Sequence, residues 1–168
     1  MSKVKAFLKR KDIVFSAKRY FIDAMSAMAQ GLFCSLLIGT IIKTLGQQLN
    51  LPFMVEMGGF ASAMAAPAMA IAIGYALKAP PLVLFSLAAV GQAANTMGGS
   101  GGPLAVFFIA IIAAEIGKAI SKETKVDILV TPFVTIFAGV VVSYAIAPPI
   151  GAVANAFGTL INHTTALQ

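Results

Sequence analysis

The sequence predicts an all-α integral membrane protein, with about five transmembrane helices and a cytoplasmic N-terminus. Of its 168 residues, 59% are hydrophobic and 11% are charged, whereas soluble domains carry about 25% charged residues. The mean hydropathy is +0.91. About 20 helical residues cross a hydrocarbon core of roughly 30 Å. Four uncharged runs are long enough to do so, at residues 24–42, 57–77, 79–114 and 128–147.

The run at residues 79–114 is long enough for two spans. It is interrupted by the glycine-rich segment 98–102 (GGSGG), after which Pro103 opens a second apolar stretch. We therefore expect two helices joined by a glycine-rich turn. The predicted spans are 21–45, 58–77, 79–97, 103–121 and 127–147, within a membrane domain over residues 21–161.

Residues 1–20 form a basic segment ahead of the first span. Val4, Phe7 and Leu8 share one helical face, which is typical of an amphipathic helix lying in the membrane interface. A solvated basic tail up to Arg10 is the alternative. Arg19 precedes the next carboxylate by four residues, so the spacing predicts a local ion pair with Asp23.

The basic residues predict the orientation. All but one of the 12 Lys and Arg residues lie before the first span, after the second or after the fourth; the exception is Lys43. Because cytoplasmic loops carry an excess of Lys and Arg, the N-terminus is expected inside. The glycine turn is then on the outer side, or dips inward from it.

The second span is rich in alanine and glycine, which allow helix backbones to approach closely in lipid. Pro67 falls in its middle and removes one intrahelical hydrogen bond. We expect an interior helix. The fifth span is expected to begin near Asp127, in a helix N-cap role, and to end at Pro148-Pro149. Residues 150–161 are then too short to cross and form a half-helix.

Polar side chains cluster just before the glycine turn. Gln92 and Asn95 are three residues apart on one helical face, and Thr96 follows. Gly98 and Gly99 begin a segment that lacks the Gly-Lys-Ser/Thr ending of a P-loop. The glycines either allow a tight reversal between packed helices or expose backbone amides to a ligand. Amide side chains beside such a turn suit a hydroxyl-rich substrate.

Glu115 is the one carboxylate deep within a predicted span. From Pro103 it lies about 18 Å along the helix, where an unpaired charge costs on the order of 2 to 3 kcal/mol or more. Two interpretations stand side by side. Lys118, at i+3, pairs with it, or the carboxylate faces a polar cavity as a substrate or proton site.

Several functions are not indicated. The formal net charge of +6 follows the membrane topology rather than a nucleic-acid surface. The single cysteine, Cys34, is expected to pack as a small hydrophobe and cannot form an intrachain disulfide. The sequence has no catalytic constellation, no metal-ligand cluster and no cofactor motif, so we expect no enzyme, metal or cofactor.

Four local patterns together resemble a known family. They are residues 19–28 (RYFIDAMSAM), 95–103 (NTMGGSGGP), 114–118 (AEIGK) and 125–132 (KVDILVTP). Their order and spacing resemble the second type of enzyme IIC membrane proteins of the bacterial phosphotransferase system, a family of sugar permeases. The resemblance covers nearly the whole chain, from about Tyr20 to Ile161.

The resemblance implies a multi-pass permease in the cytoplasmic membrane of a bacterium. Such proteins are usually homodimers and translocate a small sugar-like substrate, while IIA and IIB proteins carry the phosphoryl group. Family members are about twice this length, so the chain, with its tail 162–168, is a truncated product, a portion of a longer protein or a shortened paralogue. The rival hypotheses are a non-transporting membrane regulator or scaffold and a proton-coupled transporter that uses Glu115.

Overall fold

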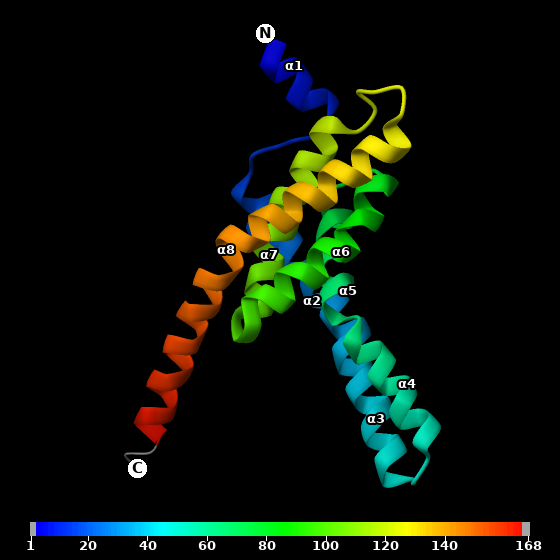
Figure 1. The fold of residues 1–168 in the computed structure, drawn as a ribbon, viewed down its shortest axis with the longest axis vertical. Helices are drawn as coiled ribbons and strands as arrows, with labels where there is room; N and C mark the ends of the chain where they lie inside the picture. The colour runs from blue at the N-terminus through cyan, green and yellow to red at the C-terminus, as the bar shows by residue number, and fades with distance from the viewer. Residues whose placement is uncertain (1–2, 166–168) are drawn as a thin grey trace.

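The computed structural model describes residues 3–165, with side chains described up to residue 161. Within this part of the chain all regular structure is helical, which confirms the all-α prediction. The helices are α1 (Lys3–Arg10), α2 (Ala24–Leu32), α3 (Ile38–Gln48), α4 (Pro52–Ala63), α5 (Ala65–Ala76), α6 (Pro81–Gly98), α7 (Gly102–Ile120) and α8 (Asp127–Thr165). They form a compact head from which two arms diverge (Figure 1).

Helices α2 and α3 belong to one continuous helix of 31 residues, about 46 Å long. Two π-helical segments interrupt it, Lys18–Asp23 and Phe33–Leu37. A π-helical turn bonds residues five apart rather than four, which moves Asp23 out of register with Arg19. The predicted pair between them is therefore wrong: the Arg19 guanidinium lies 2.5 Å from Asp12 instead.

Helices α4 and α5 form one bent pair, with an angle of 45° between them. The pair starts earlier than the predicted second span because Pro52 occupies the first helical turn, where a proline loses no hydrogen bond. The break falls at Met64. Pro67 explains it, since proline has no N–H for the Ala63 carbonyl and its ring collides with that group.

Helix α5 is an interior helix, as the alanine-rich sequence predicts. Met69, Ala70 and Ile73 are at most 1% exposed. Neighbouring glycines bring two helices onto its backbone, because a Cβ on Gly31 of α2 or Gly91 of α6 would lie 2.6 Å from an α5 carbonyl oxygen. Such contact at small residues is how helices associate in lipid. In helix α4, in contrast, only Gly58 is buried.

Helices α6 and α7 form an antiparallel hairpin. The chain reverses at Gly99–Gly101, where Gly99 adopts a positive φ of 51°. A Cβ on Gly102 would lie 2.3 Å from Asn95, and one on Gly117 would lie 2.7 Å from Val83. The hairpin is therefore in close contact from the turn to its open end.

Three helical stretches in the described residues are long and apolar enough to span a membrane: Lys18–Gln48, Pro81–Ile120 and Asp127–Ile161. The bent α4–α5 pair would be a fourth. The stretch Pro81–Ile120 folds back on itself at the glycine turn, so it comprises two helices of 18 and 19 residues, each about 28 Å long. The number of complete crossings stays a prediction.

Helix α8 differs from the sequence prediction at its C-terminal half. It continues for 39 residues through Pro148 and Pro149, so residues 150–161 are not a separate half-helix. The two prolines deprive the Tyr144 and Ala145 carbonyls of their intrahelical donors. Tertiary packing holds the helix together here, because the glycine turn lies directly against Ile150 and Gly151.

Helix α7 lies at the centre of the head, with buried side chains over most of its length. The first half of α8 packs across the α6–α7 hairpin, and the α3–α4 hairpin and the second half of α8 form the two arms (Figure 1). The arms expose large apolar side chains: Phe53 and Phe60 on one, Phe157 and Leu160 on the other. Such surfaces are suited to lipid or to another apolar protein surface.

The basic segments gather at one end of the molecule. The C-terminal end of α1 contacts the α7–α8 loop, where Arg10 and Glu123 form an ion pair at 2.8 Å. The α5–α6 turn, with Lys78, reaches the same end (Figure 1). The grouping on which the orientation argument depends is therefore present. Which side of the membrane this end faces stays a prediction.

Candidate functional site

The glycine turn places bare backbone against a polar side chain. Asn95 lies one turn before the end of α6, and its amide oxygen occupies the space in which a Cβ on Gly102 would lie. Only glycine at position 102 allows this contact. The Asn95 amide is therefore held at the start of α7.

The turn also contacts α8 backbone to backbone. A Cβ on Gly151 would lie 2.5 Å from the Gly98 carbonyl oxygen, and one on Gly101 would lie 2.9 Å from the Ile150 carbonyl oxygen. Beside this contact, the Ser100 hydroxyl donates a hydrogen bond to Oδ1 of Asn155 at 2.5 Å. The sequence left two explanations for these glycines, a tight reversal between packed helices or backbone amides exposed to a ligand. The contacts at Gly98, Gly101 and Gly102 support the tight reversal.

The other residues predicted at this site lie along the last turns of α6. Gln92 and Thr96 are exposed, Asn95 is half-buried, and Gly98 is buried. The Thr96 hydroxyl donates to the Gln92 carbonyl at 2.9 Å, within the helix. Gly99 has open space around it. This end of the hairpin therefore presents an exposed amide side chain, Gln92, and a half-buried one held against Gly102, Asn95, beside a bare turn.

Glu115 lies at the opposite end of α7. Its Oε1 accepts a hydrogen bond from the Tyr20 hydroxyl at 3.1 Å. Its Oε2 lies 3.1 Å from the Lys118 ammonium, in an ion pair whose side chains are 14% and 1% exposed. Of the two interpretations left open by the sequence, the pairing with Lys118 is present in the structure.

The Lys118 ammonium binds more than its carboxylate partner. It also donates to the carbonyl of Leu77, at the end of α5, at 2.9 Å, and to the carbonyl of Asp12, after α1, at 2.8 Å. Arg19 donates to the same Leu77 carbonyl at 2.7 Å. These cations satisfy carbonyls that helix ends leave without an N–H donor.

This ion-pair cluster contains groups that the sequence analysis did not single out, namely Asp12, Tyr20 and the Leu77 carbonyl, and it contains Arg19, which was predicted to pair with Asp23. The Arg19 guanidinium beside Asp12 holds the pKa of that carboxyl below its ordinary value. The clue in the sequence was the density of charge around Arg19. Tyr20 and Glu115, which share a hydrogen bond, are more than 90 residues apart in the sequence. Their pairing follows from tertiary contact alone.

The two polar regions are separate. Glu115 follows Gly102 by 13 positions on one helix, which places it about 20 Å away along the axis. The structure therefore brings Gln92, Asn95, Thr96, Gly98 and Gly99 together but does not bring Glu115 to them.

Two further expectations concern single side chains. Cys34 is exposed rather than packed, because it lies on the outer face of the long N-terminal helix. Asp127 begins α8, and its Oδ1 accepts hydrogen bonds from the Lys122 N–H at 2.6 Å and the Thr131 hydroxyl at 2.5 Å. In the described residues no three His, Cys, Asp or Glu side chains lie close enough to hold a metal ion.

These features define a helical membrane protein whose polar side chains gather at the two ends of one buried hairpin. The chain belongs to the phosphotransferase system EIIC family, because the family described as "Phosphotransferase system, EIIC" matches residues 22–168. Its members are the membrane permease components of that system. The resemblance seen in the four motifs is thereby confirmed. Comparisons with curated proteins and with solved structures found no match.

Proposed function

We propose that this permease component translocates a small sugar-like substrate across the bacterial cytoplasmic membrane, with its N-terminus in the cytoplasm. Phosphoryl transfer to the substrate is carried out by partner IIA and IIB proteins. The chain itself supplies the path and no catalytic group, metal or cofactor.

One observation carries this proposal: the position of the glycine turn. Figure 1 shows the α6–α7 turn between the two arms, nearer to the head than the ends of the arms are. If the arms span the bilayer, the turn lies at membrane depth. Non-helical backbone is tolerated there only where it is buried in protein or lines a water-filled cavity. A polar turn between two apolar arms therefore favours a substrate passage.

We assign substrate binding to Gln92, Asn95 and Thr96, with the backbone at Gly98 and Gly99. Amide side chains both donate and accept hydrogen bonds, which suits the hydroxyl groups of a sugar. Asn95 is fixed by its contact with Gly102, whereas Gln92 is exposed and free to adapt. Glu115 was included in the predicted site, but its ion pair and its distance from the turn support a structural role.

The proton-coupled alternative depends on reversible protonation of Glu115. In the structure this carboxylate is held in an ion pair with the Lys118 ammonium at 3.1 Å, which supports a structural role rather than a proton site. Uptake by proteoliposomes distinguishes the three hypotheses. Accumulation that requires a phosphoryl donor supports the permease, and a requirement for a pH gradient supports proton coupling. A membrane effect that is independent of any sugar supports the regulator or scaffold.

Asn95→Ala is expected to weaken apparent substrate affinity about tenfold, because one well-aligned hydrogen bond contributes about 1.5 kcal/mol. Ser86→Ala on the same helix is the matched control, since the Ser86 hydroxyl is bonded within the helix to the Leu82 carbonyl. The measurement is the concentration dependence of phosphoryl-donor-dependent uptake. Equal affinity in the two variants would remove Asn95 from the substrate site.

We also propose that the protein is a homodimer. The two arms expose large apolar side chains that the other described residues do not cover. A second copy could cover them, as in related permeases. Mass measurement in lipid nanodiscs is expected to give twice the chain mass; a monomer would leave lipid as the partner of both arms.

A further inference from the structure

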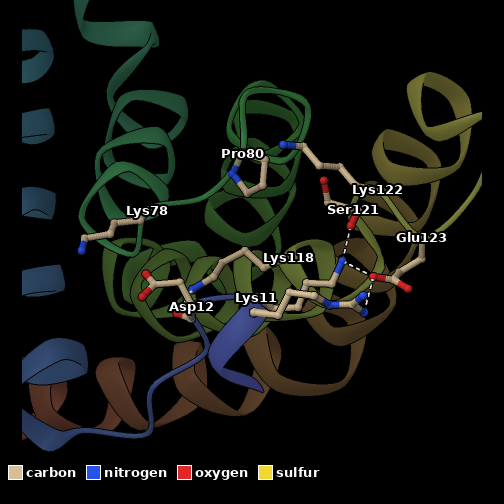
Figure 2. Close-up of a pocket in the computed structure, with 9 residues that line it drawn as sticks. Lys11, Asp12, Lys78, Pro80, Lys118, Ser121, Lys122 and Glu123 are labelled. Carbon is tan, nitrogen blue, oxygen red and sulfur yellow. Dashed lines mark hydrogen bonds and ion pairs between the residues drawn. The ribbon is translucent and has the colours of Figure 1, made fainter. Parts of the chain in front are cut away.

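A cavity of about 300 Å³ opens at the basic end of the molecule, at the lower limit of volumes that bind small ligands. Three separate segments build it: the end of α1, the α5–α6 turn, and the end of α7 with the loop that follows it. Figure 2 shows the nine lining residues, among them Asp12 next to Lys118 and Lys122 extending past Pro80.

The lining of the cavity carries an excess of positive charge. Five of its residues are lysine or arginine, and two, Asp12 and Glu123, are acidic. Glu123 is paired with Arg10 and with Lys11, and the Lys11 ammonium holds the pKa of Glu123 below its ordinary value. Asp12 is paired with Arg19. Both carboxylates are therefore charged at neutral pH and already have partners.

The cations are not equally engaged. The Lys11 ammonium donates to the Ser121 carbonyl, and Lys118 binds the two carbonyls and the carboxylate described above. These two lysines stabilise the ends of helices. The side chains of Lys78 and Lys122 make no hydrogen bond or ion pair with any other residue in the described part of the chain. Two ammonium groups thus remain for a ligand.

The backbone is also strained at several residues that line the cavity, among them the lysines Lys78 and Lys122. In the described residues, four residues other than glycine have a positive φ, and three of them line this cavity: Asp12 at 54°, Lys78 at 57° and Lys122 at 63°. Lys78 follows the end of α5, where the Ala79 N–H bonds to the Gly74 carbonyl at 2.9 Å. Glycine is the residue that suits such a position. Strained residues other than glycine are found most often at ligand clamps and active sites.

We propose that this cavity binds a phosphate group, held by the Lys78 and Lys122 ammonium groups. A phosphate monoester carries a charge of nearly −2 at neutral pH and presents three acceptor oxygens. Two ammonium groups match that charge better than they match a single carboxylate. Figure 2 shows them on opposite sides of Asp12 and Lys118, so both long side chains turn toward the phosphate when it binds. Pro80, at the rim, directly precedes α6, and the positive end of that helix dipole adds to the attraction.

The phosphate has two possible sources with the same chemistry: a water-soluble phosphate or phosphate ester, and the headgroup of an anionic lipid. The cavity lies at the end expected to face the cytoplasm, where both are present. The inference does not depend on sugar transport, so its failure would leave the permease proposal intact.

The test uses the full chain in nanodiscs of phosphatidylcholine, titrated with inorganic phosphate by calorimetry at constant ionic strength. Saturable binding is expected, and sodium chloride should produce none. Lys78→Gly and Lys122→Gly are each expected to weaken binding about tenfold, by loss of one charge-assisted hydrogen bond. Lys125→Gly, in the same loop but outside the cavity lining, is the charge-matched control and should bind as the parent does.

Thermal unfolding separates a ligand site from a merely basic surface. Because glycine suits a positive φ, both cavity variants should unfold at or above the temperature of the parent without phosphate. They should also lose the stabilisation by phosphate. Asn50→Gly is the strain-matched control, since Asn50 has a positive φ of 52° away from this cavity; it should keep that stabilisation.

A second arm identifies the source of the phosphate. If nanodiscs containing phosphatidylglycerol abolish the response to inorganic phosphate, the lipid headgroup is the ligand. If the response persists, the ligand is water-soluble. Absence of saturable binding by the parent, or equal binding by the parent and the Lys78→Gly/Lys122→Gly double variant, would overturn the proposal.

Discussion

Replacing Lys118 with methionine is expected to destabilise the protein by about 3 to 5 kcal/mol, the usual result of removing one partner of a buried ion pair. Methionine has a similar length and fits a buried position. The loss therefore comes from charge and hydrogen bonding. Glu115 would become an unpaired charge, and the Leu77 and Asp12 carbonyls would each lose a donor.

The measurement is SDS-induced unfolding in mixed micelles, followed by circular dichroism. Glu115→Leu in the Lys118→Met background should recover part of the loss, because the buried charge is then absent. Lys125→Met, in the exposed loop after α7, should change the free energy of unfolding by less than about 0.5 kcal/mol. A small effect of Lys118→Met would show that the cluster does not fasten α1 and α5 to α7.

The same variants bear on mechanism. If the pair is structural, the Lys118→Met/Glu115→Leu double variant should retain uptake wherever it folds. Complete loss of uptake in a stably folded double variant would return Glu115 to the transport path and reopen the proton-coupled alternative.

Gly151→Ala is expected to cost about 1 to 3 kcal/mol, in the range measured for overpacked sites. Its Cβ would lie 2.5 Å from the carbonyl oxygen of Gly98. Both sides of this contact are backbone, so no flexible side chain can yield. The α8 arm would have to move away from the glycine turn, at the point where two prolines have already removed hydrogen bonds.

Gly158→Ala is a matched control on the same helix. Apart from the adjacent backbone of α8, no atom of the described residues lies within 4 Å of a Cβ at position 158, and alanine favours a helix over glycine by about 1 kcal/mol. The two substitutions should therefore change stability in opposite directions, measured by the same unfolding assay. If the turn lines the substrate path, Gly151→Ala should also reduce uptake, whereas Gly158→Ala should not. Equal behaviour of the pair would contradict the contact between the turn and α8.

Much of the architecture could be predicted from the sequence because its signals are local. The long uncharged runs predict helices in lipid, and the GGSGG segment predicts a reversal before Pro103. Alanine and glycine in residues 58–77 predict an interior helix, and the structure places α5 inside. Prolines were harder to interpret. Pro67 was expected only to remove a hydrogen bond, yet its helix breaks at Met64. Pro148 and Pro149 were expected to end their helix but do not, because packing of Gly151 against the turn offsets the lost bonds.

In the candidate site, too, contacts between residues close in the sequence could be predicted and the others could not. Gln92, Asn95 and the glycines are neighbours in sequence, so their proximity at the end of α6 was predictable. Lys118 and Glu115 are also neighbours, and their pairing was one of two stated alternatives. The register of a helix decided the rest: π-helical turns at residues 18–23 separate Arg19 from Asp23 and leave Arg19 to bind Asp12.

The sequence by itself determined that the chain is a membrane protein, that it is helical and that its basic residues group at one end. Each of these properties depends on composition and short-range periodicity. The tertiary structure alone decided which charges meet. Contacts between Tyr20 and Glu115, between Arg10 and Glu123, and between Lys118 and the Asp12 carbonyl join residues far apart in the chain. Such contacts depend on how helices pack against one another, and no local pattern encodes that arrangement.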